Sequence, residues 1–270
     1  AVSAACWLLS LITKDTSWVD RIWSIVPIAY VWIFAGAAIA EGKDASRLVI
    51  MGVLVTAWGA RLTFNFARKG GYTGMEDYRW AILRGRMKPW QFQLFNVFFI
   101  VLYQNALLVL IALPAQIAWQ YDAPLGVWDA VFAILFLVLL VGETVADQQQ
   151  WNFHRAKARA GGELGPGFVT TGLFRLSRHP NFFFEQSQWW AFYAMGATAA
   201  VASGLGVWGG AINWTIIGAV LLTLLFIGST VFTESISSAK YPAYAEYQRT
   251  TSMLVPLPPR RSAQRAQRPA

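Results

Sequence analysis

The sequence has little of what soluble enzymes use to build polar sites. It contains one cysteine, Cys6, which excludes an internal disulfide, and two histidines, which argue against a histidine-built metal centre. Charged residues make up 13% of the chain and hydrophobic residues 56%, whereas charged residues are about a quarter of an ordinary soluble domain. This composition excludes an ordinary soluble protein and predicts an integral membrane protein.

Long apolar segments make up most of the sequence. Most of them have a length close to the roughly 20 residues that a helix needs to cross a bilayer. We therefore expect an all-α protein with seven transmembrane helices. The first segment is short, as a truncated one would be. The segments lie at about residues 1–13, 22–40, 48–66, 94–118, 127–146, 181–205 and 211–233.

The basic residues divide unevenly between the two sides of this map. Nineteen of the 22 Lys and Arg lie in loops 14–21, 67–93 and 147–180 or after residue 233, and only two lie in the opposite loops. By the positive-inside rule, the N-terminus is expected outside and the C-terminus in the cytoplasm. The net charge of +8 then reflects topology and anionic lipid, so no nucleic-acid partner is expected. We expect one domain over residues 1–256 and a disordered basic tail over 257–270.

Polar residues gather at the cytoplasmic ends of these segments. Helical spacing places Glu143, Asp147, Trp151 and His154 on one face, and it places Asn181 four residues before Glu185. Polar groups at membrane depth usually face a cavity or each other, so we expect a cytoplasm-facing polar cavity without a metal. Purely structural readings stay open: interfacial anchoring for Asp20, snorkelling for Arg61, helix entry for His179–Pro180 and surface packing for the C-terminal tyrosines.

One run carries a resemblance to known proteins. GLFRLSRHPNFFFE at 172–185, followed by a Trp-rich helix, resembles the signature of the steroid 5α-reductase and sterol-reductase superfamily. From about residue 20 to residue 256 the chain is similar to the bacterial steroid-reductase-like branch, including MEDYR at 75–79 and KYPAYAEYQRTTSMLVP at 240–256.

The resemblance implies a seven-helix enzyme that binds NADPH from the cytoplasm. The similarity to the bacterial branch implies a location in the bacterial inner membrane. The enzyme would reduce the C=C bond of a lipophilic enone, such as a 3-oxo-Δ4 steroid, that enters from the membrane lipid. The catalytic carboxylate of the family matches Asp20, seven residues before Pro27. Its catalytic Tyr is here Trp58, which cannot supply a proton, and Tyr30 is a candidate for that role.

The coenzyme contacts follow from matching positions and from the basic rim of the cytoplasmic face. The Asn of the family's N-x3-D pattern is here Glu143, and its Asp is Asp147. The full candidate set is Arg61, Asp147, Trp151, His154, Arg175, Arg178, His179, Asn181, Glu185, Glu234, Tyr241 and Tyr244.

Two other functions stay open. The isoprenylcysteine carboxyl and phospholipid methyltransferases have a similar RHPxYxG helix entry and bind S-adenosylmethionine, but they generally lack an acid at the position of Glu185. A lipid-binding membrane protein without catalytic activity is the third reading, and Trp58 in place of the family's Tyr is its best argument.

Overall fold

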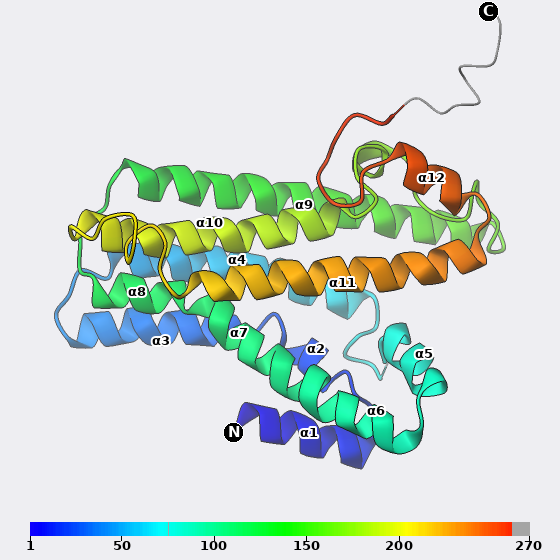
Figure 1. The fold of residues 1–270 in the computed structure, drawn as a ribbon, viewed down its shortest axis with the longest axis horizontal. Helices are drawn as coiled ribbons and strands as arrows, with labels where there is room; N and C mark the ends of the chain where they lie inside the picture. Colours follow the sequence, from blue (N-terminus) through cyan, green and yellow to red (C-terminus); the bar gives the residue numbers. More distant parts are fainter. Residues whose placement is uncertain (75, 261–270) are drawn as a thin grey trace, which may run out of the picture. The chain divides into compact units, whose positions relative to one another are not determined.

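The structure, a computed structural model, describes residues 1–74 and 76–260, and all the named elements in this part of the chain are helices. The prediction of an all-α protein is confirmed, and Figure 1 shows long helices together with several shorter ones. The expected tail lies mostly at 261–270, outside the described residues. In chain order the elements are α1 Val2–Thr13, α2 Trp18–Ile22, α3 Val26–Ala40, α4 Ser46–Arg68, α5 Tyr78–Arg86, α6 Pro89–Phe95, the π-helix η1 Asn96–Tyr103, α7 Gln104–Ala112, α8 Pro114–Gln120, α9 Val127–Arg159, the 3-10 helix η2 Gly172–Arg175, α10 Pro180–Ala202, α11 Ile216–Lys240 and α12 Tyr244–Thr250.

Length and composition of the helices indicate a membrane protein in contact with lipid. Within the described residues, four helical stretches are long and apolar enough to cross a bilayer: Ser46–Arg68, Pro89–Gln120, Val127–Arg159 and Ile216–Lys240. The helices α1 and α3 are apolar but shorter. The helix α10 is not among the four, and its first half carries Asn181, Glu185, Gln186 and Gln188. Seven crossings and the orientation of the termini stay predictions.

Several boundaries differ from the predicted segments for local reasons. The segment expected to start at 22 is preceded by the separate helix α2, and α3 starts only at Val26 with Pro27 in its first turn, a position that proline tolerates because its missing N–H has no helical partner there. The helix α9 continues to Arg159, well past residue 146, because its polar continuation stays helical beyond the apolar part. The loop expected at 67–93 contains α5, whose N-cap Asp77 accepts a hydrogen bond from the Arg79 backbone N–H.

The chain divides into two compact units that alternate along the sequence. The first unit comprises residues 1–136 and 189–222, and the second comprises 137–188 and 223–270. The helices α9, α10 and α11 therefore each contribute residues to both units. The expectation of a single domain stays a prediction.

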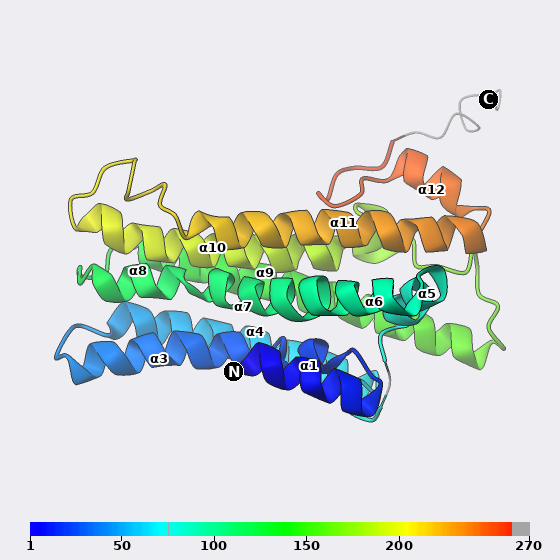
Figure 2. The same ribbon diagram turned by 60° about the horizontal axis from the view of Figure 1, so that its bottom comes forward.

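Glycines permit close helix packing in the first unit. The helices α3 and α4 pack along each other (Figure 2). A Cβ atom at Gly59 of α4 would lie 2.4 Å from the Ser24 carbonyl oxygen and 2.5 Å from the Ile28 side chain. The later helices use the same device, because Cβ atoms at Gly196 and Gly218 would each lie 2.4 Å from a backbone carbonyl oxygen, of Pro114 and Leu110 respectively. Small residues at such contacts are how membrane helices approach one another.

A buried ion pair joins the start of α4 to the start of α9 in the same unit. Arg47 Nε and Nη2 donate to the two carboxylate oxygens of Asp129 at 2.7 and 2.9 Å, and both side chains are almost fully buried. The remaining Arg47 donors reach the carbonyl oxygens of Ala123 and Pro124, while Asp129 also accepts from the Gly126 N–H. This bidentate pair, with its further hydrogen bonds satisfied, fixes the loop that precedes α9.

We predict that Gly59→Ala destabilises the protein by about 1–3 kcal/mol, because the added methyl group meets a backbone atom that cannot move independently. The matched control is Gly36→Ala on the facing helix α3, where a Cβ atom would meet nothing within 4 Å. Thermal unfolding of the two purified variants in detergent measures the difference. Equal melting temperatures for the two variants would contradict the close α3–α4 contact.

Candidate functional site

Asp20 of the first unit is held by an indole. Its Oδ2 accepts a hydrogen bond from Trp80 Nε1 of α5 at 3.0 Å. Burial is the largest influence on this carboxyl, and the negative charge of Asp77 adds to it. Together they outweigh the opposing effects of Arg79, Trp80 and Ser17, so the pKa of Asp20 is raised above its usual range. This shift is toward the neutral carboxyl, the form that can donate a hydrogen bond.

The segment around Asp20 is fastened to the chain that follows α4. Glu76 accepts from the Thr16 N–H and hydroxyl at 3.0 and 2.7 Å, and it pairs with Arg84. Burial alone would raise the pKa of Glu76, but the hydrogen bonds from Arg84 and Thr16 lower it overall. Asp15 pairs with Arg21. The position of Asp20 is thus set by contacts with residues about 60 positions later in the chain.

Trp58 and Trp189 form an edge-to-face pair in the core of the first unit. Their ring centroids lie 4.9 Å apart at 81°, and both side chains are fully buried. Neither indole N–H has a hydrogen-bond acceptor among residues 1–74 and 76–260. An unsatisfied buried donor is uncommon in folded proteins and costs roughly 1–3 kcal/mol. These two N–H groups are therefore available to an acceptor that is not part of the described chain.

The other candidates of this unit lie apart from these hydrogen bonds. Tyr30 is half-buried on α3, and Arg61 is half-buried on α4, three residues after Trp58. Within the described part of the chain, no hydrogen bond joins Asp20 to Trp58 or to Tyr30. The structure thus assigns Asp20 a partner, Trp80, that the predicted catalytic set did not include.

In the second unit, the predicted faces of α9 and α10 meet. Asn181 Nδ2 lies 3.5 Å from Asp147 Oδ1, and Gln188 Nε2 donates to Glu143 Oε2 at 2.7 Å. The two pairs run in opposite chain directions, so the helices are antiparallel here. A Cβ atom at Gly142 would lie 2.6 Å from the Phe184 ring, which shows how closely the helices approach. Buried carboxylates and amides thus line one helix interface.

The remaining predicted residues of α9 and α10 extend this polar face. Glu185 is buried, Trp151 is half-buried and His154 is exposed. The ring of His154 packs edge-on against Phe153 at 5.8 Å. Among the described residues, no group of three His, Cys, Asp or Glu side chains is arranged to hold a metal ion.

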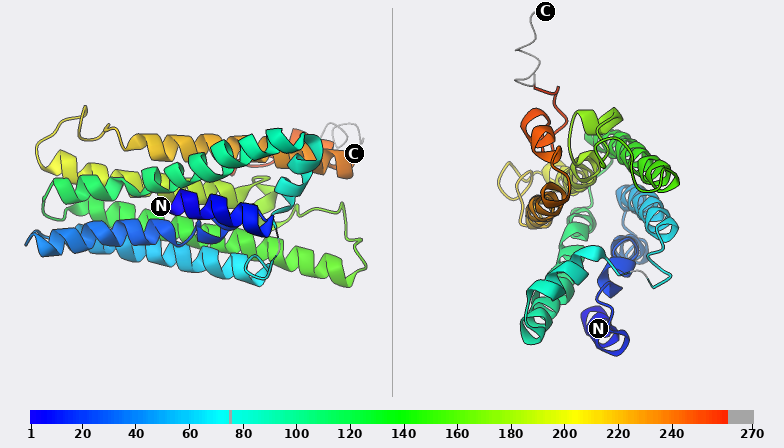
Figure 3. Two further views of the ribbon diagram at one scale, coloured as in Figure 1. Left: turned by 90° about the horizontal axis from the view of Figure 1, so that it is seen from below. Right: turned by 90° about the vertical axis from the view of Figure 1, so that its right-hand side faces the viewer.

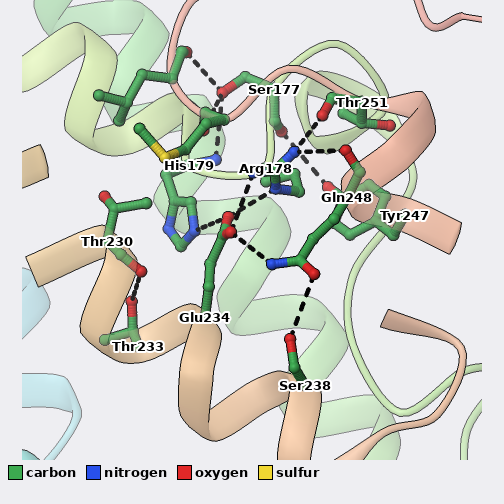
Figure 4. Close-up of polar contacts among 12 residues, drawn as sticks. Ser177, Arg178, His179, Thr230, Thr233, Glu234, Ser238, Tyr247, Gln248 and Thr251 are labelled. Carbon is green, nitrogen blue, oxygen red and sulfur yellow. Dashed lines mark hydrogen bonds and ion pairs between the residues drawn. The ribbon is translucent and has the colours of Figure 1, made fainter. Parts of the chain in front are cut away.

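Glu234 of α11 is the centre of a polar network that Figure 4 shows. Arg178 Nε and Nη2 donate to its two oxygens at 2.6 and 3.0 Å, and Gln248 Nε2 donates at 2.9 Å. His179 Nε2 lies 3.0 Å from Glu234 Oε1. Arg178 also donates through Nη1 to the carbonyl oxygens of Gln248 and Thr251. The arginine and the glutamate are thus occupied by each other and by the neighbouring chain.

This network holds the C-terminal segment in place. The segment after α12 lies beside residues 177–179, where the Arg178 and His179 N–H groups donate to the carbonyl oxygens of Ser252 and Met253. The helix α12 itself lies beside the end of α11 (Figure 3). Tyr247 donates from its hydroxyl to the Phe174 carbonyl oxygen. Arg178 and His179 therefore have a structural role, because they hold the C-terminal segment against residues 177–179.

Arg175 differs from Arg178 although both are basic residues of the same run. It lies at the end of η2, is exposed, and has no ion-pair or hydrogen-bond partner among the residues that the structure describes. Of these two arginines, Arg175 is the one whose guanidinium remains available for an anionic ligand.

The tyrosines of the C-terminal segment have different environments. Lys157 Nζ donates to the Tyr241 hydroxyl at 2.9 Å, and this bond, with help from Lys240, lowers the pKa of Tyr241. Tyr244 is buried against Phe168, with ring centroids 4.9 Å apart. Burial and the nearby charge of Glu234 raise the pKa of Tyr244. Only Tyr241 of these two is partly exposed to solvent.

Sequence reasoning missed three residues that position the candidates. Trp80 contacts Asp20 from a loop that looked unstructured. Gln149 accepts from the Leu173 N–H at 2.9 Å and fixes η2 against α9. Gln188 donates to Glu143 across the contact between α9 and α10. The tryptophan in EDYRW was the one available signal, because a large aromatic residue in a charged loop usually has a packing partner.

Comparison with known proteins gives a family. The model of a family described as "Protein of unknown function (DUF1295)" matches residues 6–251. The chain belongs to this DUF1295 family. It is similar to an uncharacterized protein of Schizosaccharomyces pombe, with 40% identity over 266 residues that cover 93% of this chain and 75% of the yeast protein. No solved structure matches the chain significantly.

The DUF1295 match includes the candidates of both units. It runs from α1 to the end of α12, so Asp20, Trp58, Asp147 and Glu234 all lie within it. Arg178 and the residues it contacts up to Thr251 are inside the matched range as well. Both groups of polar residues thus belong to the family's own region of the chain.

We predict that Arg178→Gln lowers the free energy of unfolding by about 3–5 kcal/mol, because it leaves the buried Glu234 carboxylate without its cationic partner. Arg175→Gln is the matched control and should leave stability unchanged, since that side chain is exposed and unpaired. Thermal unfolding of both variants in detergent measures this. A small effect of Arg178→Gln, equal to that of Arg175→Gln, would contradict the structural role of the network.

Proposed function

We propose that the protein is a membrane-embedded, NADPH-dependent reductase of the C=C bond of a lipophilic enone, with a 3-oxo-Δ4 steroid as the expected substrate class. In this proposal seven helices cross the membrane and the polar residues face the cytoplasm. The observation that carries it is the pair Asp147 and Asn181. These residues, 34 positions apart, match the coenzyme-binding positions of the reductases that the chain resembles, and they lie 3.5 Å apart.

The second unit has groups that suit a dinucleotide. Asp147 and Asn181 offer an acceptor and a donor for hydroxyl and amide groups. Arg175 offers an exposed guanidinium without a partner among residues 1–74 and 76–260, and guanidinium groups bind phosphate oxygens in a two-point arrangement. When bound, NADPH would supply the hydride that reduces the β-carbon of the enone.

Asp20 is proposed to stabilise the charge that develops on the substrate carbonyl oxygen. Its raised pKa favours the protonated carboxyl, and a neutral acid can donate a hydrogen bond to an oxygen that becomes negative. The N–H of Trp80 holds Oδ2 at 3.0 Å and so orients the group. Uptake of a proton at the α-carbon would complete the reduction.

Trp58 is proposed as a second donor to the same oxygen. Its buried N–H lacks an acceptor within the described chain, and a substrate carbonyl would relieve that cost. An indole can donate a hydrogen bond but cannot transfer the proton. Trp58 in place of the family's tyrosine would therefore act by stabilising charge, while another group supplies the proton.

The apolar interior of the first unit supports the proposed substrate class. The first unit buries mostly aliphatic and aromatic side chains, among them Trp58, Trp189 and Phe192. Such a surface suits a flat apolar molecule with a single carbonyl oxygen, and the lipid bilayer is the natural source of it.

The test is turnover by Asp20→Asn compared with wild type, using purified protein, NADPH and a panel of enones. We expect turnover to fall by about 10²-fold or more, because the amide N–H of Asn is a much weaker acid, and so a weaker donor to a developing charge, than a protonated carboxyl. Stabilisation of the protein by NADPH should persist.

Wild-type turnover should decline as the pH rises through the raised pKa of Asp20, because ionisation of the carboxyl removes the hydrogen-bond donor. The residual turnover of Asp20→Asn should lack this pH dependence.

The matched control is Asp122→Asn, an exposed acid of the same unit, which should behave as wild type. Stabilisation by S-adenosylmethionine and not by NADPH would replace the proposal with a methyltransferase. Stabilisation by neither would favour a lipid-binding protein. Normal turnover in Asp20→Asn would remove Asp20 from the mechanism while leaving the reductase itself in place.

For Trp58→Phe we predict a small loss of stability and a larger loss of activity. The smaller ring leaves a cavity, but a buried donor without a partner is also removed, so the melting temperature should fall only slightly. Turnover should fall by roughly 10-fold to 100-fold, as for other single donors to a developing charge. Steady-state kinetics and thermal unfolding of the same preparation measure both. Unaltered turnover would show that the indole N–H has no role in the reaction.

A further inference from the structure

A partly open cavity lies in the first unit, between the start of α9 and the last turns of α10. Its volume is about 480 Å³. Trp128 and Phe132 of α9 form one wall, with their rings stacked at 5.9 Å. Ala194, Ala197 and Val201 of α10 form another. One wall is thus aromatic and the other is built mainly from small residues, which leaves a groove between them.

The polar atoms that border this groove are already satisfied. Thr198 Oγ1 donates to the Ala194 carbonyl oxygen at 2.8 Å. The Tyr193 hydroxyl donates to the Ala211 carbonyl oxygen at 2.8 Å and accepts from the Asn213 N–H at 3.1 Å. None of the residues that line the groove carries a charge. A ligand inside it would lose hydration without gaining a hydrogen bond from these side chains, so only an apolar group fits.

The helix α9 presents exposed apolar side chains near the groove. This helix is apolar enough to cross a bilayer, and Val131, Ile134 and Leu135 are exposed on it next to the groove. Trp128 itself is 60% exposed, and Trp208 and Trp214 in the segment after α10 are exposed as well. Tryptophans favour the boundary between headgroups and hydrocarbon. In a membrane, these tryptophans would place one end of the groove at that boundary and the rest toward the hydrocarbon region.

The length of the groove matches the thickness of the hydrocarbon region of one leaflet. The lining of α10 runs from Tyr193 to Ala202, which is roughly 14 Å at 1.5 Å per residue, and half of the hydrocarbon core is about 15 Å. The groove thus has the reach of one acyl chain.

We propose that this groove binds a single acyl chain of a membrane lipid, from the leaflet at the end of the molecule where α9 begins. The groove recognises the acyl chain and not the headgroup, because the polar groups in its walls form their hydrogen bonds with other atoms of the protein. The site is separate from the residues assigned to the proposed reductase, so it stands or falls independently of that activity.

The test is photolabelling in vesicles of phosphatidylcholine that carries a diazirine in one acyl chain, with labelled positions mapped by mass spectrometry. In the full-length protein we expect label at the α10 residues of the groove at several times the level found at exposed α9 residues such as Leu135. Vesicles that contain phosphatidylglycerol with the same labelled chain should give the same result, because the headgroup is not recognised.

Ala194→Phe places a ring in the groove and should reduce the α10 label by at least 5-fold. The matched control is Ala130→Phe, at an exposed position of α9 outside the groove, which should leave the label unchanged. Equal labelling in Ala194→Phe, or wild-type label spread evenly over the exposed helix faces, would overturn the proposal. Cross-links between two copies through groove residues would overturn it too.

A measurement on the wild type alone keeps the proposal testable if Ala194→Phe fails to fold. Native mass spectrometry of the detergent-purified protein should find a phospholipid retained, and saturating short-chain detergent should compete it away. Complete absence of retained phospholipid at the mildest detergent conditions would count against a specific chain site.

Discussion

A bundle in a bilayer has no water in its interior, so each buried charge must find its partner within the protein. Two arginines illustrate this constraint, one in each unit. Arg47 donates hydrogen bonds to Asp129 and to two backbone carbonyl oxygens. Arg178 donates in the same way to Glu234 and to two other backbone carbonyl oxygens. Because an arginine separated from its acid would be costly, these pairs determine which chain segments must lie together. The surrounding loops take their course from them.

The same constraint makes the unsatisfied groups informative. The indole N–H groups of Trp58 and Trp189 lack acceptors among the described residues, in an interior where most polar side chains have found one. Asp20 accepts its hydrogen bond from a neutral indole, whereas Glu234 accepts hydrogen bonds from an arginine. We propose that groups of this kind bind the ligand, and this is why the proposed chemistry is assigned to them.

The sequence allowed the prediction of features that follow from local spacing. Apolar runs indicated the helices, and residues four apart on α9 and α10 indicated the faces on which Asp147 and Asn181 meet. It could not indicate that Arg178 is occupied while Arg175 is exposed, because both are basic residues of one short run and their partners lie far along the chain. Trp80 and Asp20 are 60 positions apart in the sequence. Helical periodicity indicates contacts only between residues a few positions apart, so it could not indicate this one.

The alternation of the two units along the chain has a consequence for biosynthesis. The first unit cannot be complete until residues 189–222 have been synthesised, yet all of 137–188 precedes them. The carboxylates of α9 and the polar entry of α10 therefore leave the ribosome while the first unit still lacks its last helices, and Glu234 follows later still. During translation Arg178 therefore emerges well before Glu234, the acid with which it pairs, has been made.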